Sequence, residues 1–268
     1  MSAAPQGAAL DFDGRKYRQA SAHQKQWGHG VIEGLALRGD ETILDLGCGD
    51  GVLTAQLARL VPRGAVLGID ASPGMIATAT QLTAPNLSFR CLDMAAMDFT
   101  AQFDLIFSNA ALHWVPGHPR LARASLAALR PGGVIRWNFG GRGNCANLIA
   151  SLREVMARPP YDGLFADFAW PWTMPGRDEY AALLDEAGFR DVHVELENRD
   201  RLFADADELI AWMDQPCLVP FLAHLPSPER AGFRTLVIDR MLSRSRHGDG
   251  RCFETFRRLD VTATTPGR

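Results

Sequence analysis

The chain has 268 residues, of which 47% are apolar, and its formal net charge is −3 at pH 7. This length and composition can bury a full hydrophobic core, and we expect one domain that carries a sizeable insertion. Dense basic runs are missing, which argues against nucleic acid or an anionic membrane surface as the main partner.

The five cysteines are scattered, without a C-x-x-C pair or the Cys/His spacing of a metal site, so we expect reduced thiols and no metal. The sequence shows neither a signal peptide pattern nor a run of about 20 apolar residues that could span a bilayer. These features predict a soluble, cytoplasmic protein. Nearly all basic residues are arginines, a bias that suits carboxylate recognition but can equally reflect genome composition.

The first 38 residues are expected to form an N-terminal helical lid. Residues 1–12 are weakly patterned, and a helical pattern then runs from Asp13 to Leu37, with Tyr17 and Trp27 on its apolar side. These two aromatic residues could pack into the core, or they could close over a ligand.

The stretch TILDLGCGDG, from Thr42 to Gly51, predicts a buried strand, a glycine turn and the start of a helix. Glycines let the backbone approach a ligand closely, and the first turn of a helix presents unpaired N–H groups. We therefore expect a small molecule to bind at this turn.

Further strands are predicted at residues 65–70, 87–93, 103–109 and 134–139, with helices beginning near Pro73 and His118. Alternation of strands and helices predicts an α/β fold with a Rossmann-like, doubly wound, mostly parallel sheet. Its cofactor-binding core would span residues 39–140. Helix and strand patterns at 177–199 and 251–268 would complete a seven-stranded sheet.

Two mainly helical segments, 141–176 and 200–250, interrupt this pattern and are expected to form a cap. They are rich in large aromatic residues, which could line an acceptor pocket or form the cap's own core. The residues in question are Phe165, Trp170, Trp172, Trp212 and Phe221.

The predicted strand ends carry Gly47, Gly49, Asp70, Asp93 and Asn109. In a doubly wound sheet, ligands bind at this edge. A dinucleotide is disfavoured because Val52 occupies the place of the third glycine in G-x-G-x-x-G, and the chain contains no phosphate-binding G-x-x-x-x-G-K-[ST] loop.

The motif D-x-G-x-G-x-G from Asp45 to Gly51 resembles that of class I S-adenosylmethionine-dependent methyltransferases. The resemblance covers roughly residues 40–140 and includes the GID triplet, CLDM, FDLIFSNAALHW and the L-R-P-G-G turn. The stretches SNAALHWVPGH and ELIAWMDQPCLVPFL are similar to the trans-aconitate methyltransferase group and to juvenile-hormone-acid methyltransferase-like proteins.

This resemblance implies S-adenosylmethionine as the cofactor, with S-adenosylhomocysteine as product. Asp70 would accept hydrogen bonds from the ribose hydroxyls. Asp93 would accept from the adenine amine beside Met94, or would only cap a helix. Asp45 would offset the cofactor's ammonium group, or would only stabilise the turn. The full predicted set is Asp45, Gly47, Cys48, Gly49, Asp70, Ala71, Asp93, Met94 and Asn109.

His113 follows the fourth strand and could act as a base or orient the acceptor, or it could pack beside the cofactor. A base is needed for a phenol, hydroxyl, amine or carbon acid, whereas a carboxylate is already ionised. The residues predicted to contact the acceptor are Tyr17, Trp114, Arg142, Trp172 and Trp212, although Arg142 could be a solvated loop residue.

The sequence thus predicts a methyltransferase that acts on a small molecule, with carboxyl O-methylation as the preferred reaction. One alternative is C- or O-methylation of a larger apolar natural product. Another is a non-catalytic protein that only binds S-adenosylmethionine. The sequence does not indicate the oligomeric state.

Overall fold

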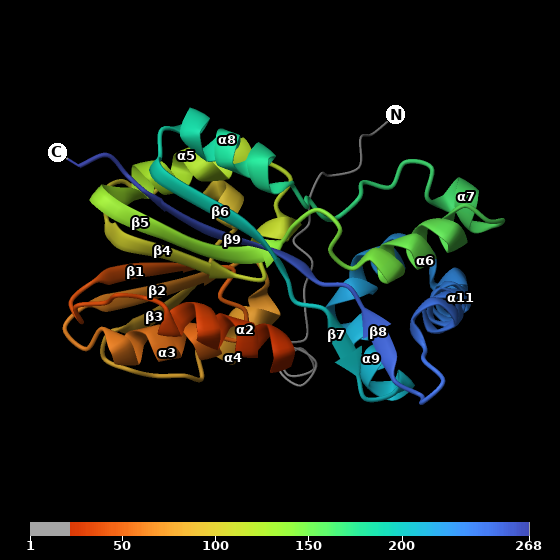
Figure 1. The fold of residues 1–268 in the computed structure, drawn as a ribbon. Helices are drawn as coiled ribbons and strands as arrows, with labels where there is room; N and C mark the ends of the chain where they lie inside the picture. Colours follow the sequence, from red (N-terminus) through yellow and green to blue (C-terminus); the bar gives the residue numbers. More distant parts are fainter. Residues whose placement is uncertain (1–21, 268) are drawn as a thin grey trace.

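A seven-stranded sheet forms the centre of the computed structural model, which describes residues 22–267 (Figure 1). The strand order is β3-β2-β1-β4-β5-β9-β6, and β9 runs in the direction opposite to that of the other six strands. The predicted mostly parallel, doubly wound sheet is therefore confirmed. The strands are β1 (Thr42–Leu46), β2 (Ala65–Asp70), β3 (Leu87–Cys91), β4 (Phe103–Asn109), β5 (Leu129–Gly140), β6 (Arg190–Asn198) and β9 (Arg257–Thr264).

Helices cover both faces of the sheet (Figure 1). On one face lie α2 (Ala22–Glu33), α3 (Val52–Leu60) and α4 (Pro73–Ala79), and on the other lie α5 (His118–Ala128) and α8 (Arg177–Ala187). Each face has its own apolar cluster: Ile32 and Leu57 pack on the first side, and Leu121 and Tyr180 on the second. The near-continuous apolar strands fit burial on both faces.

The strand order reverses between β1 and β4, which are neighbours in the sheet. From β1 the chain continues to β2 and β3 on one side, and from β4 it continues to β5 on the other side. Ligands of doubly wound proteins bind outside the carboxyl ends of the strands at such a reversal. The short 3₁₀ turns after β3 (Met94–Ala96) and β4 (Leu112–Trp114) lie at this edge.

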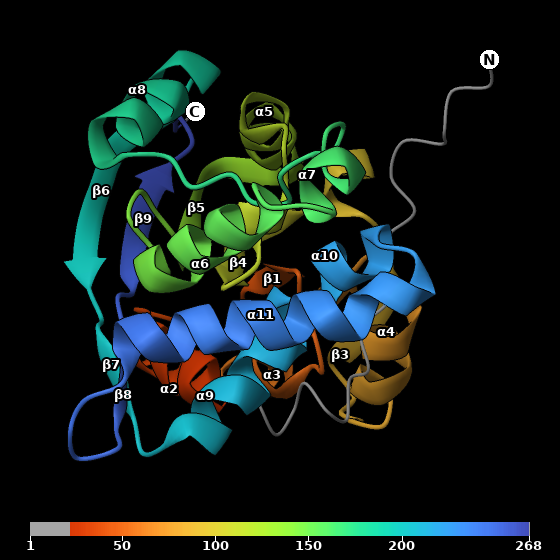
Figure 2. The same ribbon diagram turned by 90° about the vertical axis from the view of Figure 1, so that its right-hand side faces the viewer.

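The two segments predicted to form a cap contain the following elements: α6 (Ala146–Met156), α7 (Tyr161–Leu164), α9 (Ala206–Trp212), a π-helical turn (Met213–Cys217), α10 (Val219–His224) and α11 (Ser227–Ser245). Leu152 and Phe165 of the first predicted insertion share a single apolar cluster with Phe221 and Val237 of the second. The cap lies beside the sheet in Figure 1, and α11 runs across it in Figure 2.

The segment 251–268, which was predicted to complete the sheet, contains two strands. Strand β8 (Cys252–Glu254) pairs with β7 (Arg201–Phe203) in a small separate ribbon, and β9 then enters the main sheet at Arg257. The alternation of apolar residues is the same in both pieces, so periodicity alone could not locate the break.

The start of α6 is stabilised by a residue that is distant in the sequence. The N-cap is Cys145, and its side chain makes no capping bond. The carboxylate of Glu254 instead accepts hydrogen bonds from the Asn147 and Leu148 backbone amides. A capping group from 106 residues away is invisible to local sequence patterns.

Strand β5 begins at Leu129, earlier than the predicted residue 134, because Leu129 pairs with Phe103 of β4. The register shifts between Phe103 and Leu105, which accommodates the Pro131-Gly132-Gly133 turn inside the strand. Between residues 22 and 267, no helix combines the length and apolar character required to cross a membrane.

Candidate active site

The glycine turn joins β1 to α3 and is made of residues in the left-handed backbone region. Gly47, Gly49 and Gly51 have φ values of 68°, 55° and 78°, which only glycine adopts without strain. The backbone amides of Gly47 and Cys48 both donate to the Ile69 carbonyl, at 2.8 and 2.9 Å. These bonds hold the turn against the end of β2.

Gly47 also permits close packing on the loop after β4. A Cβ atom at this position would lie 2.3 Å from the Ala111 Cβ and 3.1 Å from the Met94 Cε. The turn, the loop after β3 and the loop after β4 therefore meet at one point of the sheet edge.

Asp70 ends β2 beside this turn. Its Oδ2 accepts from the Gly49 amide and its Oδ1 from the Ser72 amide, both at 2.9 Å. Burial raises the pKa of this carboxyl group, against the effect of the two amide donors. Each carboxylate oxygen has two lone pairs, so both can accept one more hydrogen bond, as a ribose diol would require.

Asp45 lies beneath the turn and is 2% exposed. The Thr54 hydroxyl donates to its Oδ2 at 2.7 Å. Burial, with a smaller contribution from the charge of Asp70, raises the pKa of Asp45 to about 7. A cation bound near Asp45 would favour its ionised form.

Asp93 is the N-cap of the 3₁₀ turn after β3, and its Oδ1 accepts from the Ala95 amide at 2.9 Å. Its side chain is exposed, and the next residue, Met94, is buried beside Gly47. The predicted role of Asp93 as a helix cap is therefore confirmed. The capping hydrogen bond uses one lone pair of the carboxylate, so the carboxylate can still accept hydrogen bonds from a ligand.

The remaining predicted cofactor residues lie at the same edge. The Cys48 thiol is buried against Gly68, and burial raises its pKa well above the usual value, so the thiol stays protonated. Ala71 is half-buried directly after Asp70, and Asn109 ends β4. Cys48 can therefore contribute to ligand binding through its backbone and its packing, and not as a thiolate.

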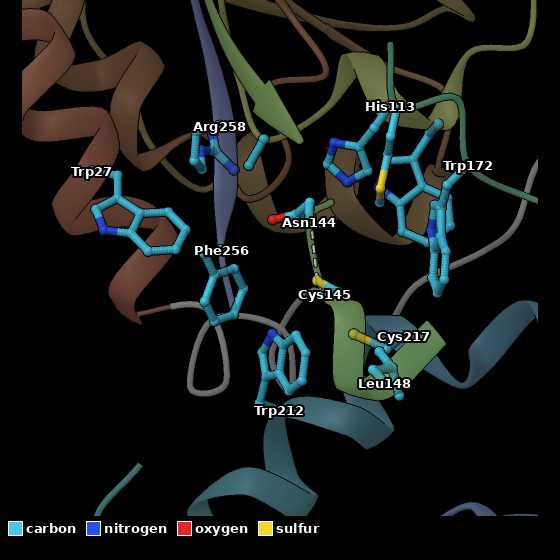
Figure 3. A pocket seen from close by; sticks show the side chains of 13 residues that line it. Trp27, His113, Asn144, Cys145, Leu148, Trp172, Trp212, Cys217, Phe256 and Arg258 are labelled. Carbon is cyan, nitrogen blue, oxygen red and sulfur yellow. Dashed lines mark hydrogen bonds between the residues drawn. The ribbon is translucent and has the colours of Figure 1, made fainter. Parts of the chain in front are cut away.

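A pocket lies between this edge and the cap (Figure 3). Its walls are mainly aromatic and apolar, with a few polar side chains. The cavity volume is about 50 Å³. The lining residues are Trp27, Ala110, His113, Trp114, Asn144, Cys145, Leu148, Trp172, Met174, Trp212, Cys217, Phe256 and Arg258.

Arg258 of β9 brings a buried positive charge to this pocket. It is 3% exposed and its guanidinium lies 4.9 Å from the centre of the Trp27 ring. Its Nε donates to Asn138 Oδ1 at 2.6 Å, and its terminal nitrogen donates to the Asn138 carbonyl and to Asn109 Oδ1, at 2.7 and 3.2 Å. These oxygens fix the orientation of the guanidinium group.

Sequence reasoning missed Arg258. Its partners Asn138 and Asn109 lie 120 and 149 residues earlier in the chain. The available signal was an arginine among the apolar residues of a predicted buried strand, where a charge is rare unless it is paired or functional.

His113 lines the pocket from the 3₁₀ turn after β4. Burial, with the nearby charge of Arg258, lowers its pKa to about 3. The Gly140 amide faces its Nδ1 at 3.5 Å, which assigns the proton to Nε2. The imidazole is therefore a neutral hydrogen-bond donor near pH 7.

Trp114, Trp172 and Trp212 of the predicted acceptor contacts also line the pocket. Arg142 does not belong to the lining: its exposed side chain pairs with Glu179 at 2.8 Å. Tyr17 lies outside the described residues.

The other predicted aromatic residues of the cap belong to its apolar core and do not line the pocket. Phe165 and Phe221 are buried in the cap's own core, and Trp170 packs on that core at 5.5 Å from Phe221. Within residues 22–267, no group of His, Cys, Asp and Glu side chains is arranged to hold a metal ion.

Comparisons with known proteins point to one family. Residues 43–133 match the model of a methyltransferase domain. The chain is 35% identical over 232 residues to a trans-aconitate 2-methyltransferase of Deinococcus radiodurans, covering 84% of this chain and 86% of the relative.

Solved structures share the fold at low sequence identity. Phosphoethanolamine N-methyltransferase 2 of Haemonchus contortus, in complex with S-adenosylhomocysteine, has a TM-score of 0.61 at 16% identity, covering 94% of this chain and 57% of that one. The [4+2]-cyclase SpnF has a TM-score of 0.57 at 18% identity, covering 91% and 81%. Because a cyclase has this fold as well, the fold alone does not determine the reaction.

Proposed function

We propose that this chain, which belongs to the S-adenosylmethionine-dependent methyltransferases, transfers a methyl group to a carboxylate oxygen of a small molecule. When bound, S-adenosylmethionine supplies a methyl group on a sulfonium: the carboxylate oxygen forms the new bond to carbon, and the electrons of the broken bond return to sulfur. The Deinococcus relative is named for methylation of a carboxylic acid.

The cofactor would bind along the edge formed by β1, β2 and β4. Asp70 would accept from the ribose hydroxyls, and Asp93 from the adenine amine beside Met94. The glycine turn would lie against the methionine part of the cofactor. Asp45 would interact with the ammonium group directly or through water, which would keep its carboxylate ionised near pH 7.

The observation that supports the choice of reaction is the neutral His113 in the wall of the pocket. A phenol, alcohol or protonated amine must lose a proton before or during methylation, and a histidine with a pKa of about 3 is a poor base for this step. A carboxylate needs no base, because it is ionised at neutral pH. His113 Nε2 would donate a hydrogen bond to it.

The protein's contribution would then be to position the acceptor and exclude water. We propose that residues 141–176 and 200–250 act as a cap over the acceptor, with Trp172 and Trp212 as its contact residues.

The test is to incubate the full chain with S-adenosylmethionine labelled in the methyl group and a panel of carboxylic acids, phenols and amines. An alkali-labile label in a product with the mass of a methyl ester supports the proposal. Alkali-stable label in an ether, amine or carbon-methylated product would contradict it, and S-adenosylhomocysteine binding measured by calorimetry checks the cofactor site separately.

A further inference from the structure

Two buried polar side chains near His113 take no part in the chemistry proposed above. His118 is the first residue of α5 and Tyr180 lies in α8, and these helices pack together on one face of the sheet (Figure 1). His118 is 3% exposed and Tyr180 is 0% exposed. Burying a polar group is costly unless its hydrogen bonds are made inside the protein, so the partners of both side chains indicate what they do.

A chain of two hydrogen bonds links Tyr180 to the backbone through His118. The His118 Nε2 lies 3.1 Å from the Leu112 carbonyl oxygen, and its Nδ1 lies 3.2 Å from the Tyr180 hydroxyl oxygen. A carbonyl oxygen can only accept, so Nε2 carries the proton. Burial lowers the pKa of His118 and raises the pKa of Tyr180, so the imidazole is neutral and the hydroxyl keeps its proton near pH 7. Tyr180 therefore donates to His118, and His118 donates to Leu112.

The bond from His118 reaches the 3₁₀ turn that carries His113. Leu112 is the first residue of this turn, and its carbonyl also accepts from the Val115 amide at 2.9 Å. Both lone pairs of this carbonyl oxygen are therefore used. The Thr173 amide donates to the His113 carbonyl at 2.8 Å. The turn is thus held from outside by a side chain of α5 and by the backbone of the cap segment.

The same two side chains also support the amide that faces the His113 ring. Phe139 of β5 packs on His118 at 5.6 Å and on Tyr180 at 5.1 Å, measured between ring centres. The next residue is Gly140, whose amide lies 3.5 Å from the His113 Nδ1. A hydrogen bond of this length is weak and sensitive to position. The orientation of the His113 ring therefore depends on groups that His118 and Tyr180 contact.

From these contacts we infer that His118 and Tyr180 are positioning residues that direct the His113 Nε2 toward the acceptor. Both lie within the described residues, and neither lines the pocket, so they would act through His113. This inference rests on the proposed function and extends it to residues that set how tightly the acceptor is held. Because His113 would donate a hydrogen bond and transfer no proton, their removal should change KM for the acceptor and not kcat.

Tyr180→Phe removes the hydroxyl group and keeps the ring. The His118 Nδ1 then lacks a donor, so the imidazole can adopt the other neutral tautomer, which cannot donate to Leu112. With labelled S-adenosylmethionine and trans-aconitate as the acceptor, we expect KM to rise about threefold to fivefold, whereas kcat and the Kd for S-adenosylhomocysteine stay within about twofold. The matched control is Tyr161→Phe in the apolar core of the cap, which should leave all three values unchanged.

A double-mutant cycle shows whether Tyr180 acts through His113. In a His113→Phe background there is no N–H left to direct, so Tyr180→Phe should not raise KM further. An equal rise in both backgrounds would show that Tyr180 only contributes to packing, and would overturn the inference.

Substitutions of His118 give a second test if Tyr180→Phe does not fold. His118→Gln keeps an N–H donor for Leu112 and an oxygen that can accept from Tyr180, so KM should stay within about twofold of the unsubstituted value. His118→Leu removes both groups and should raise KM about tenfold. Equal KM values in the two variants would contradict the role of the hydrogen-bond chain.

NMR spectra of protein isotopically labelled at the histidine nitrogens test the chain without turnover, because they separate the two neutral tautomers. We expect protonated Nε2 in both His113 and His118, and altered signals of both in Tyr180→Phe but not in Tyr161→Phe. An unchanged His113 signal in Tyr180→Phe would overturn the inference whether or not an acid is methylated. Altered signals without any ester from the panel of carboxylic acids would contradict carboxyl methylation and leave the positioning role in place.

Discussion

Asp70 and Gly49 are joined by a hydrogen bond of 2.9 Å, from the Gly49 amide to the Asp70 Oδ2. This bond ties the acid at the end of β2 to the glycine turn after β1. The same carboxylate also accepts from the Ser72 amide. The residue expected to bind the ribose therefore also fixes the shape of the cofactor-binding edge.

Replacing Asp70 should consequently reduce both cofactor affinity and stability. Asp70→Ala removes two bonds to the backbone and the proposed bonds to the ribose, and we expect a loss of about 2 kcal/mol or more in S-adenosylhomocysteine binding, roughly 30-fold in Kd. Calorimetry measures this value. Asp70→Asn, which keeps one acceptor oxygen, should lose less, and an unchanged affinity in the alanine variant would remove Asp70 from the site.

Asp45 should make cofactor binding dependent on pH. Its pKa is raised to about 7 in the folded chain, so below this pH the carboxyl group is largely protonated and cannot offset an ammonium group. If binding the cation favours the ionised form, the affinity for S-adenosylhomocysteine should increase about tenfold between pH 6 and pH 8.

The matched control for this prediction is Asp45→Asn, which keeps the shape and the contact with Thr54 but does not titrate. Calorimetry at several pH values should give a nearly flat profile for this variant. A rise of equal size in both proteins would assign the pH dependence to another group.

His113 should contribute a hydrogen bond and no proton transfer. Because its pKa is lowered to about 3, it stays neutral from pH 6 to pH 9, and kcat for a carboxylate acceptor should be nearly constant over this range. His113→Gln keeps an N–H donor, so its kcat and KM for a carboxylate acceptor should stay within about threefold of the values for the unsubstituted protein. His113→Phe should raise KM about tenfold, as expected for one lost hydrogen bond.

The pH profile of the rate separates this role from catalysis by a base. A limb with an apparent pKa between 6 and 7 that disappears in His113→Gln would identify His113 as the base. That result would also favour a phenol, alcohol or amine as the acceptor.

The sequence could predict that the residues of the proposed cofactor site lie together, because their positions depend on local patterns. The glycines of the turn adjoin β1, and Asp70, Asp93 and Asn109 each follow or end a strand whose apolar run is readable. Parallel strands bring such positions to one edge of the sheet, so chain order alone places them together.

The acceptor side could not be predicted in the same way. Arg258 reaches the pocket from the last strand of the sheet, and Glu254 caps α6 across 106 residues. These contacts depend on how the cap packs on the sheet, and no local pattern encodes it. Arg142 seemed suitable because it follows β5, but the structure pairs it with Glu179 at the surface.

Helix α2 offers a test of how tightly the edge is packed, because it carries two glycines with opposite surroundings. A Cβ on Gly28 would lie 2.3 Å from Leu53 Cδ1 and 2.9 Å from Asn109 Nδ2, whereas a Cβ on Gly30 would meet no atom within 4 Å. Gly28→Ala should therefore displace the ends of the Leu53 and Asn109 side chains, and the cost of this crowding should offset the gain in helix propensity, so that its free energy of unfolding stays about 1 kcal/mol or more below that of Gly30→Ala. Gly30→Ala should raise the free energy of unfolding by about 0.5–1 kcal/mol, because alanine favours the helix. Urea denaturation measures both values.

Since Asn109 ends β4 at the proposed cofactor edge, Gly28→Ala should also weaken S-adenosylhomocysteine binding, whereas Gly30→Ala should leave it unchanged. Equal effects of the two substitutions would mean that α2 does not pack against this edge as described.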